Sequence, residues 1–398
     1  MSWQDTTIGS ICDEHGGDVQ TGPFGSQLHA SDYADHGIPI VMPQDMQNGS
    51  IVCERIARLA PQFLGRHQRH MLEVDDIVFS RRGDVTRFAV VTESERGWIC
   101  GTGSIRIRLK CPTLDARYMS AYLRQPQIGS WLINHAQGVT MPNLNTGILR
   151  ALPVRLPPLS EQRRIADVLD RAEALRAKRR AALAELDGLA QSIFIEMFGP
   201  PTRIMSSWPT QSLGTLLRFL TSGSRGWAEY YSETGDLFLR IQNVKNDELS
   251  LNEVAFVKPP DTAEANRTKV NAGDVLLSIT ADIGRTAVVP NAIEKAFISQ
   301  HLALLRTDGI SPRFLSAYLS SESGQEQIFK RNKQGVKAGL NFDDIRSFII
   351  PLPPNNLQQE FARRVAVVEK LKAVQRASLA ELDALFASLQ DRAFRGAL

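Results

Sequence analysis

Two short loops carry the side chains best suited to contact a polyanion or the edges of nucleobases. Residues 80–87 read SRRGDVTR and lie between two apolar segments that are typical of strands. Arginine pairs well with guanine and with phosphate oxygens. A loop that carries Arg81, Arg82, Asp84 and Arg87 around one glycine therefore fits nucleic-acid contact, although an ordinary solvated hairpin fits the same residues.

The same loop recurs in the second half of the chain with altered side chains. Residues 278–285 read SITADIGR and keep Asp282 and Arg285, but an Ile-Thr pair stands where the first loop has two arginines. A shared framework with different tips is what two loops that read different targets should show. Other polar loop residues are further candidates: Gln44, Asp45, Thr140, Asn143, Gln242, Asn243, Lys333 and Lys337. For the pairs at 44–45 and 242–243 a capping or turn role is an equal alternative, and the lysines suit phosphate as well as bases.

The motifs of common catalytic and metal sites are missing from the sequence. There is no GxxxxGK[ST], GxGxxG, HExxH or GxSxG motif. The Asn/Asp-Pro-Pro-aromatic tetrapeptide with which amino-methyltransferases hold a target amine is also missing. His67 and His70 have no carboxylate cluster at ligand spacing and are expected to be surface or hydrogen-bonded histidines. The basic cluster of Arg66, Arg69 and His70 is expected on the solvated surface. We therefore expect no catalytic residue, no metal and no cofactor on this chain.

The two halves of the chain repeat each other. Residues 183–189 read LAELDGL, and residues 379–385, 196 positions later, read LAELDAL. Upstream, DDIVFS at residues 75–80 corresponds to GDVLLS at residues 273–278. Because this period is far longer than the roughly 20–50 residues of a solenoid repeat, it indicates two copies of a domain-sized unit.

Length and composition indicate a soluble protein of about two to four domains. The 398 residues are 43% hydrophobic and 22% charged, and the formal net charge is +3. No stretch is apolar enough for a membrane helix, and the first residues do not resemble a signal peptide. The four cysteines include no CxxC pair and are expected to be reduced thiols in the cytoplasm. The mild basicity permits nucleic-acid binding without requiring it.

Each copy begins with a mixed part in which short strands alternate with turn residues. The expected strands are at residues 38–42, 77–79, 88–91 and 105–109 in the first copy and at 237–241, 275–279, 286–289 and 302–306 in the second. A Pro-Pro pair follows each mixed part, at residues 157–158 and 353–354. The predicted domains are residues 1–155 (first mixed domain), 156–199 (central helix), 200–351 (second mixed domain) and 352–398 (C-terminal helix).

A long helix with an apolar seam follows each mixed part. Residues 160–198 contain no proline and one glycine, which predicts a helix of about 39 residues. Apolar residues recur at spacings of three and four, as in a coiled coil. The predicted seam residues are Ile165, Val168, Leu175, Leu186, Leu189 and Ile193 in the first helix and Phe361, Val368, Leu371, Leu382, Leu385 and Leu389 in the second. The polar seam positions Arg179 and Gln375 are candidates for setting the register.

Burying both stripes is simplest if the two helices pair in antiparallel orientation. The alternative is that each helix packs on its own mixed domain. The pairing predicts an α+β fold, with two duplicated mixed α/β domains separated by two long helices that form an antiparallel coiled coil.

This arrangement resembles the specificity (S) subunit of type I restriction-modification systems over essentially the whole chain. The most specific stretches are QGVTMPNLN at residues 137–145, QGVKAGLN at 334–341 and LPPLSEQRRIADVLD at 156–170. The stretches at 22–46 and 72–91 are similar to the opening part of such a target-recognition domain. The second copy departs from the pattern at Asn355 and Asn356, which leaves the start of its helix open.

The resemblance implies a non-catalytic subunit that reads a two-part sequence in double-stranded DNA. The helices would space the two recognition domains and dock two DNA adenine methyltransferase subunits, which bind S-adenosylmethionine, and restriction subunits would join that complex. Two other classes compete with this reading. A stand-alone DNA-modifying enzyme would need a cofactor site that the sequence does not show, and a purely protein-binding coiled-coil scaffold would leave the two mixed domains without a use.

Overall fold

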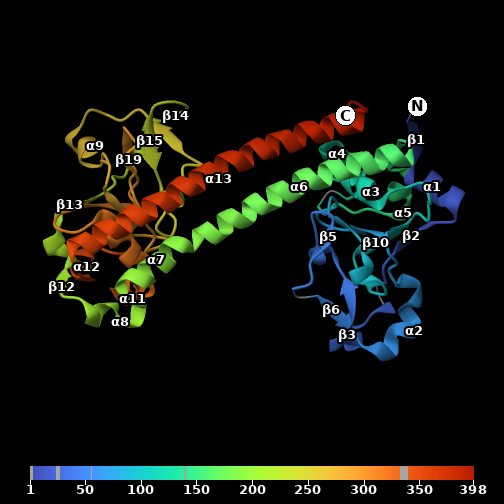
Figure 1. Cartoon of the computed structure of the whole chain (residues 1–398), viewed down its shortest axis with the longest axis horizontal. Coiled ribbons are helices and arrows are strands. Elements are labelled where there is room, and N and C mark those ends of the chain that lie inside the picture. The colour runs from blue at the N-terminus through green and yellow to red at the C-terminus, as the bar shows by residue number, and fades with distance from the viewer. Residues whose placement is uncertain (1–2, 24–26, 55, 139, 332–338) are drawn as a thin grey trace. The chain divides into compact units, whose positions relative to one another are not determined.

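The computed structural model describes residues 3–23, 27–54, 56–138, 140–331 and 339–398. The chain forms two compact units, one of Met1–Lys178 with Leu379–Leu398 and one of Arg179–Ser378. Each unit combines one mixed part with one end of each long helix, as the colours in Figure 1 show. The predicted domain boundaries separate the helices from the mixed parts instead, and they stay a prediction.

The first unit contains two principal sheets. The larger sheet has the order β2-β10-β7-β8 (Asp18–Thr21, Ser104–Arg108, Ile77–Ser80 and Phe88–Val90), with antiparallel neighbours. The smaller has the order β6-β3-β9 (Ala57–Leu59, Tyr33–Val41 and Ile99–Cys100). A ribbon joins β1 (Gln4–Thr7) to β11 (Pro153–Leu156), and a hairpin joins β4 (Met46–Gln47) to β5 (Ser50–Ile51). The four strands predicted here are confirmed, and β3 begins earlier than expected.

The second unit repeats this plan. One sheet has the order β13-β20-β17-β18 (Leu217–Ser222, Leu302–Thr307, Val275–Ser278 and Thr286–Val288). The other has the order β14-β16-β15-β19 (Tyr231–Ser232, Ala255–Val257, Asp236–Leu239 and Ala296–Ile298), and a ribbon joins β12 (Thr210–Ser212) to β21 (Ile349–Pro351). The four strands predicted for this half are confirmed as well.

Short helices cover the sheets, and long helices follow them. The short helices are α1 (Ile8–His15), α2 (Leu64–His67), α3 (Ala116–Leu123), α4 (Pro126–His135) and α5 (Thr146–Ala151) in the first unit and α8 (Pro201–Ser207), α9 (Ala263–Arg267), α10 (Pro312–Ser320), α11 (Glu322–Arg331) and α12 (Phe342–Arg346) in the second. The long ones are α6 (Leu159–Asp187), α7 (Leu189–Phe198) and α13 (Asn355–Arg395). The single helix predicted for residues 160–198 is interrupted at Gly188, because glycine has low helix propensity. None of the described helices is long and apolar enough to cross a membrane.

Matching ion pairs show that the duplication extends to side-chain contacts. In the first unit, Arg108 Nη2 lies 2.6 Å from a carboxylate oxygen of Asp76. In the second, Arg306 Nε lies 2.8 Å from Asp274. Both carboxylates are 1% exposed. Each pair links a central strand, β10 or β20, to the turn before its neighbour, β7 or β17, so the two copies share one framework.

A matching glutamine ties each long helix to its mixed part. The side-chain oxygen of Gln162 accepts a hydrogen bond from Asp115 N at 2.9 Å, and Gln358 accepts one from Ser311 N at 2.9 Å. Both glutamines are almost fully buried. Because their amides are satisfied by backbone groups, they fix where each helix leaves its domain.

The long helices run antiparallel within each unit. In the first unit, Arg176 Nε contacts Asp383 Oδ1 at 2.6 Å. In the second, Lys372 Nζ contacts Asp187 Oδ1 at 3.0 Å. These two contacts correspond under the 196-residue offset, since Arg176 matches Lys372 and Asp187 matches Asp383. The antiparallel pairing expected from the apolar stripes is therefore confirmed.

Part of the predicted seam is wrong. Leu175 and Leu189 are 51% and 38% exposed, and Leu371 and Leu385 are 46% and 50% exposed. The contacting stripe keeps the seven-residue repeat, but every second contact position lies one residue later than predicted, for example at Arg176 and Lys372. The remaining predicted seam residues are buried or half-buried: Ile165, Val168, Leu186, Ile193, Phe361, Val368, Leu382 and Leu389.

The basic stretch at residues 66–70 is only partly on the surface. Arg66 and Arg69 are exposed as expected. His70, expected on the surface, is 3% exposed, and His67 is 2% exposed. The short helix α2 and the turn after it direct both imidazoles inward, where their rings lie 6.2 Å apart.

Candidate nucleic-acid interface

The loop between β7 and β8 is shaped by its own hydrogen bonds. Ser80 N donates to Arg87 O at 2.9 Å, and the Ser80 hydroxyl donates to Arg82 O at 2.9 Å. Gly83 has a φ of 76°, a left-handed conformation that glycine adopts without a steric penalty. Arg82 is exposed at the tip of the loop, whereas Arg81 is half-buried beside it.

Asp84 stabilises this loop from within. Its carboxylate accepts hydrogen bonds from the Thr86 hydroxyl at 2.6 Å and from Arg87 Nε at 3.0 Å. The Thr86 hydrogen bond, followed by that of Arg87, holds the pKa of Asp84 below its ordinary value. Asp84 is therefore already engaged as an acceptor, and the remaining donors of Arg87 are the groups that suit a phosphate.

A second predicted loop lies against the first. Arg82 and Asn143 form an antiparallel β-bridge, and Leu144 N donates to Arg81 O at 2.8 Å. Asn143 Oδ1 is buried without a hydrogen-bond partner in the part of the chain that the structure describes. Thr140 is exposed in the same loop. The structure therefore brings four predicted residues from distant parts of the first copy together.

Within the two polar pairs, only the glutamines face solvent. The side chains of Asp45 and Asn243 each accept a hydrogen bond from the backbone N–H three residues earlier, at 2.8 and 2.9 Å. These side chains are 6% and 1% exposed. The assignment of Asp45 and Asn243 to DNA contact is therefore wrong, because both are consumed as turn caps. Gln44 and Gln242 are exposed.

Three candidates of the first unit share one cavity of about 690 Å³. Gln44, Asp84 and Arg87 line it, together with Arg124 at the end of α3. Burial lowers the pKa of Arg124, and its Nε donates to the backbone oxygen of Ser120 at 3.3 Å. Sequence reasoning missed this arginine. The only signal was the contrast between SAYLR and SAYLS at the ends of two matched helices.

The corresponding loop of the second unit keeps the backbone hydrogen bond, from Ser278 N to Arg285 O at 2.9 Å, but its serine hydroxyl has a different acceptor. The Ser278 hydroxyl donates to Asp282 O at 2.6 Å. Arg285 forms an ion pair with the Asp282 carboxylate. Asp282 and Arg285 thus pair within this loop as Asp84 and Arg87 do in the first unit. The other two candidates of this unit, Lys333 and Lys337, lie outside the described residues.

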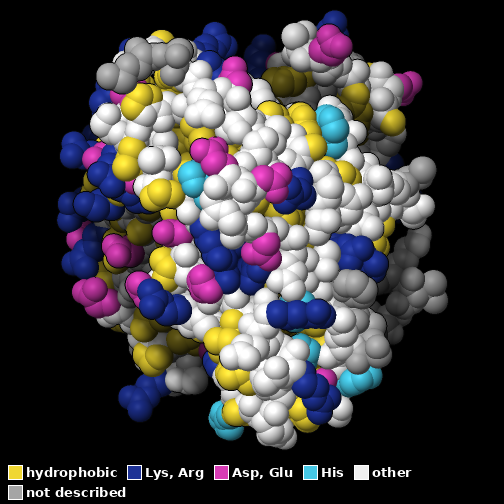
Figure 2. Space-filling model, turned by 90° about the vertical axis from the view of Figure 1, so that its right-hand side faces the viewer, with side chains coloured by type: hydrophobic (Ala, Val, Ile, Leu, Met, Phe, Trp, Pro, Cys, Tyr) yellow, Lys and Arg dark blue, Asp and Glu magenta, His cyan; other side chains and the backbone are white. Residues whose placement is uncertain are grey.

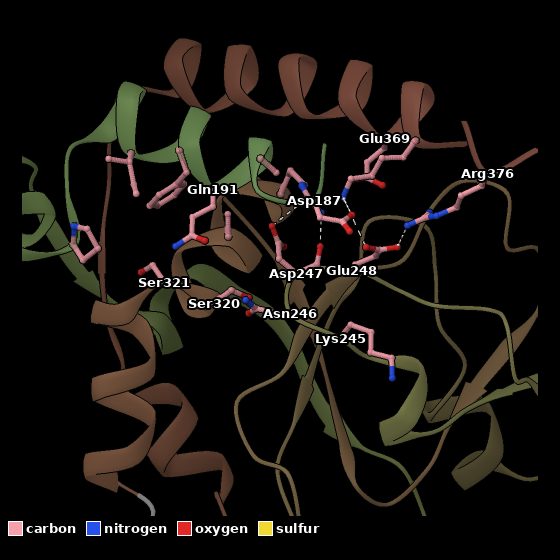
Figure 3. Close-up of a pocket in the computed structure, with 17 residues that line it drawn as sticks. Asp187, Gln191, Lys245, Asn246, Asp247, Glu248, Ser320, Ser321, Glu369 and Arg376 are labelled. Carbon is pink, nitrogen blue, oxygen red and sulfur yellow. Dashed lines mark hydrogen bonds and ion pairs between the residues drawn. The ribbon is translucent and has the colours of Figure 1, made fainter. Parts of the chain in front are cut away.

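Another cavity, of about 350 Å³, lies between the turn after β15 and the helices of the second unit (Figure 3). Asp247 Oδ2 lies 2.9 Å from Arg313 Nη2, and Asp247 Oδ1 accepts a hydrogen bond from the Ser316 hydroxyl at 2.5 Å. Burial raises the pKa of Asp247 to about 6, and the charge of Arg313 opposes that rise. The first unit has Gly49 at the matching position.

The same turn contacts α13 through its next residue. Glu248 Oε1 lies 2.6 Å from Arg376 Nη2, and Glu248 Oε2 lies 3.9 Å from Lys372 Nζ. Figure 3 shows Asp187, Glu369 and Arg376 directed toward this turn from the helices. Because the charges that line the cavity pair with one another, it fits a structural joint between the mixed part and the helices better than a ligand site.

Among the described residues, no group of three or more His, Cys, Asp or Glu side chains could hold a metal ion. On the face shown in Figure 2, Lys and Arg side chains are interspersed with Asp and Glu. A surface of this kind offers local phosphate contacts without one continuous basic groove.

Comparison with known proteins identifies the family. A family model described as the type I restriction modification DNA specificity domain matches residues 2–185 and 228–384. The chain belongs to this family. Membership of this family gives the chain a role in DNA sequence specificity.

Relatives and solved structures agree with this assignment. The chain is 25% identical over 297 residues to the specificity subunit of the Escherichia coli type I restriction enzyme EcoBI. This alignment covers 66% of this chain and 62% of that subunit. It is 22% identical over 391 residues to the EcoKI specificity subunit of Escherichia coli K12. This second alignment covers 92% of this chain and 83% of that subunit. The match to EcoBI thus spans less than two thirds of that subunit's length.

Two solved structures share the fold. The crystal structure of a type I restriction-modification S subunit from M. genitalium aligns with a TM-score of 0.60 and 16% identity, and it covers 99% of this chain and 96% of that one. A chain from a structural study of assembly and conformational transition of the type I R-M system aligns with a TM-score of 0.58 and 22% identity. That alignment covers 100% of this chain and 98% of the other. At these identities the likeness concerns the fold.

Proposed function

We propose that this chain is the non-catalytic specificity subunit of a type I restriction-modification complex and that it reads a bipartite DNA target. Each mixed part would read one half-site. The long helices would hold two DNA adenine methyltransferase subunits, which would carry the S-adenosylmethionine. Restriction subunits would join the same assembly.

One observation carries this proposal: the two copies keep the same loop framework but change the residues at its tip. The backbone N–H groups of Ser80 and Ser278 donate to Arg87 O and Arg285 O at 2.9 Å, and each loop has a matching Asp–Arg ion pair. Arg82 at the first tip corresponds to Thr280 at the second. Base contacts specify a sequence whereas backbone contacts only position the protein, so altered tips on one framework suit two different half-sites.

Exposed apolar side chains on the helices support docking of protein partners. Val367, Leu371 and Val374 recur at spacings of four and three on α13 and are 53%, 46% and 58% exposed. Such a stripe is uncommon on a helix that only faces water. We assign this stripe to methyltransferase contact.

The test is methylome sequencing of cells with and without this gene, with the partner genes present. Loss of one bipartite adenine-methylation motif is expected when the gene is deleted. Calorimetry of the purified chain with S-adenosylmethionine addresses the stand-alone enzyme. Tight binding of that cofactor, or an unchanged methylome, would contradict the proposed function.

A further inference from the structure

The two units share a backbone framework where the loop after β17 meets the loop before β20. In the second unit, Ile279 N donates to His301 O at 2.9 Å. In the first, Arg81 N donates to Gly103 O at 2.7 Å. The parallel pairing of β15 with β19 and of β3 with β9 gives the same alignment of the two copies. Individual side chains can therefore be compared position by position.

The side chains on this shared framework differ between the two copies. The matched pairs are Met42 with Arg240, Arg82 with Thr280, Gly101 with Ser299 and Gly103 with His301. In every pair except the second, the second unit has a polar side chain where the first has glycine or methionine. Arg240, Ser299 and His301 are thus polar groups that the first unit lacks at the matched positions.

These groups surround a cavity of about 370 Å³ in the second unit, which we call the Arg240 cavity. It is lined by Ser224, Arg225, Gly226, Trp227, Ala228, Tyr231, Phe238, Arg240, Ile241, Gln242, Ser299, Gln300 and His301. Its aromatic wall is rigid, since Trp227 stacks on Phe238 with ring centroids 5.0 Å apart. Gln242, Gln300 and Tyr231 on the rim are exposed.

Two polar atoms of this cavity lack partners in the described part of the chain. Arg240 Nε and Ser299 Oγ are buried and make no hydrogen bond there. The remaining contact of the Arg240 guanidinium is long, 3.5 Å from Nη2 to Glu253 O. Ser299 as a whole is only 7% exposed. Because a buried donor without an acceptor is costly, the cavity is suited to a ligand that brings acceptors.

Both ring nitrogens of His301, which also lines this cavity, have a neighbouring polar group. Its Nδ1 lies 2.5 Å from the Thr280 hydroxyl, and its Nε2 lies 3.3 Å from Gln300 Nε2. Because an amide nitrogen only donates, the contact from Gln300 needs His301 Nε2 as its acceptor. When the Thr280 hydroxyl donates to Nδ1, Nε2 carries the proton and can instead donate to a ligand. An arginine fork with a second nitrogen donor matches the two acceptors, O6 and N7, on the major-groove edge of guanine.

We propose that the Arg240 cavity receives the edge of one guanine in the half-site read by the second unit. Arg240 selects the base, and His301, positioned by Thr280, supplies the second donor. The first unit, with Met42 and Gly103 at these positions, reads its half-site without this device. The inference rests on the proposed function and adds to it which residues select which base.

The experiment uses the full chain in its methyltransferase complex, with Arg240→Met as the main variant because methionine occupies the matched position. Methylomes and binding to duplexes with single base-pair changes are measured for wild type and variant. Discrimination at one G·C pair should fall roughly tenfold to a hundredfold. The affected half-site should differ from the one that responds to Arg82→Ala. Arg218→Met, an exposed arginine of the same unit, should change nothing.

A second variant covers failure of the first to fold. Arg240→Lys keeps the charge but loses the planar fork, so it should lose the same discrimination and keep general DNA affinity. A full motif in both variants would overturn the inference. So would a loss at an A·T pair, or an equal loss on every duplex, which would indicate a phosphate contact. A wild-type complex without any bipartite motif would instead refute the proposed function.

Discussion

Arg179 Nη1 donates a hydrogen bond to Gln375 Oε1 at 2.6 Å, and these two residues occupy the same position in the two copies. Both side chains are half-buried in the contact between α6 and α13. A polar pair among the apolar positions of a seam can set the register of a coiled coil at some cost in stability. The duplication thus places its own equivalent residues opposite each other.

The Arg179–Gln375 pair should behave as a register device. Gln375→Leu alone leaves the guanidinium without its acceptor and should destabilise the protein by about 1–2 kcal/mol. The double variant Arg179→Leu/Gln375→Leu should be at least as stable as wild type, because both polar groups are removed together. Denaturant unfolding of the four proteins of this cycle measures the coupling. Additive effects of the two substitutions would contradict this role.

Lys372 should be the most sensitive charged residue of the helix pair. It is 4% exposed, and its Nζ lies 3.0 Å from Asp187 and 3.6 Å from Glu369. Lys372→Ala leaves these carboxylates without their cation and should cost about 2 kcal/mol, below the value for a fully buried pair because the acids are partly solvated. Lys370→Ala, on an exposed neighbour, should stay within about 0.5 kcal/mol of wild type. Equal melting temperatures for the two variants would rule out the network.

The buried histidine pair should make the first unit sensitive to acid. Burial, assisted by the charges of Arg69, His67 and Arg106, lowers the pKa of His70 to about 4. In an unfolded chain histidine titrates near about 6.5. Between these values the unfolded state binds a proton that the folded state does not, so stability is complete above the upper value and decreases as pH falls. The loss is at most about 3 kcal/mol near pH 4.

Melting curves between pH 7.5 and 4.5 test this prediction. His70→Gln should flatten the decrease in melting temperature, whereas His36→Gln, at an exposed position, should leave it unchanged. Parallel curves for wild type and His70→Gln would show that another group controls the acid response.

Arg82 should influence one half-site only. It is exposed at the tip of its loop, whereas Arg81 is half-buried. If Arg82 contacts a guanine, Arg82→Ala should lose about 1–3 kcal/mol of discrimination at a single base pair. Arg96→Ala, whose guanidinium pairs with Glu93 at 2.7 Å, is the matched control. An equal loss of affinity for all duplexes would assign Arg82 to a phosphate.

The helix pair should set the gap between the half-sites. Four residues inserted between Lys178 and Arg179, with four more between Ser378 and Leu379, lengthen both helices and keep the Arg176–Asp383 and Lys372–Asp187 contacts each within its own unit. The added rise is about 6 Å, so the preferred gap should grow by about one or two base pairs. The insertion in α6 alone should also lower the melting temperature, because α6 and α13 can then no longer keep the Arg176–Asp383 and Lys372–Asp187 contacts at the same time. An unchanged gap in an active variant would disprove spacing by the helices.

Much of this molecule could be predicted from local pattern. Short apolar segments between turn residues located the strands, since burial of alternating side chains is encoded along the strand itself. The 196-residue repeat indicated two copies, and the helical stripes indicated an antiparallel pair. The residues facing each other at Arg179 and Gln375 followed from the same offset, because equivalent positions in two antiparallel copies meet near the middle.

Tertiary structure alone decided which polar residues remain available for contact. Asp45 and Asn243 looked like their neighbours Gln44 and Gln242, but backbone N–H groups three residues earlier consume their side chains. Every second seam position moved by one residue, because a seven-residue repeat fits either neighbour and the facing helix decides which one is covered. Arg240 became a candidate for base contact only because residues distant in the sequence, such as Trp227 and His301, form a cavity around it. A sequence shows which residue types a chain contains, whereas burial and unpaired hydrogen-bond donors arise from contacts between distant segments.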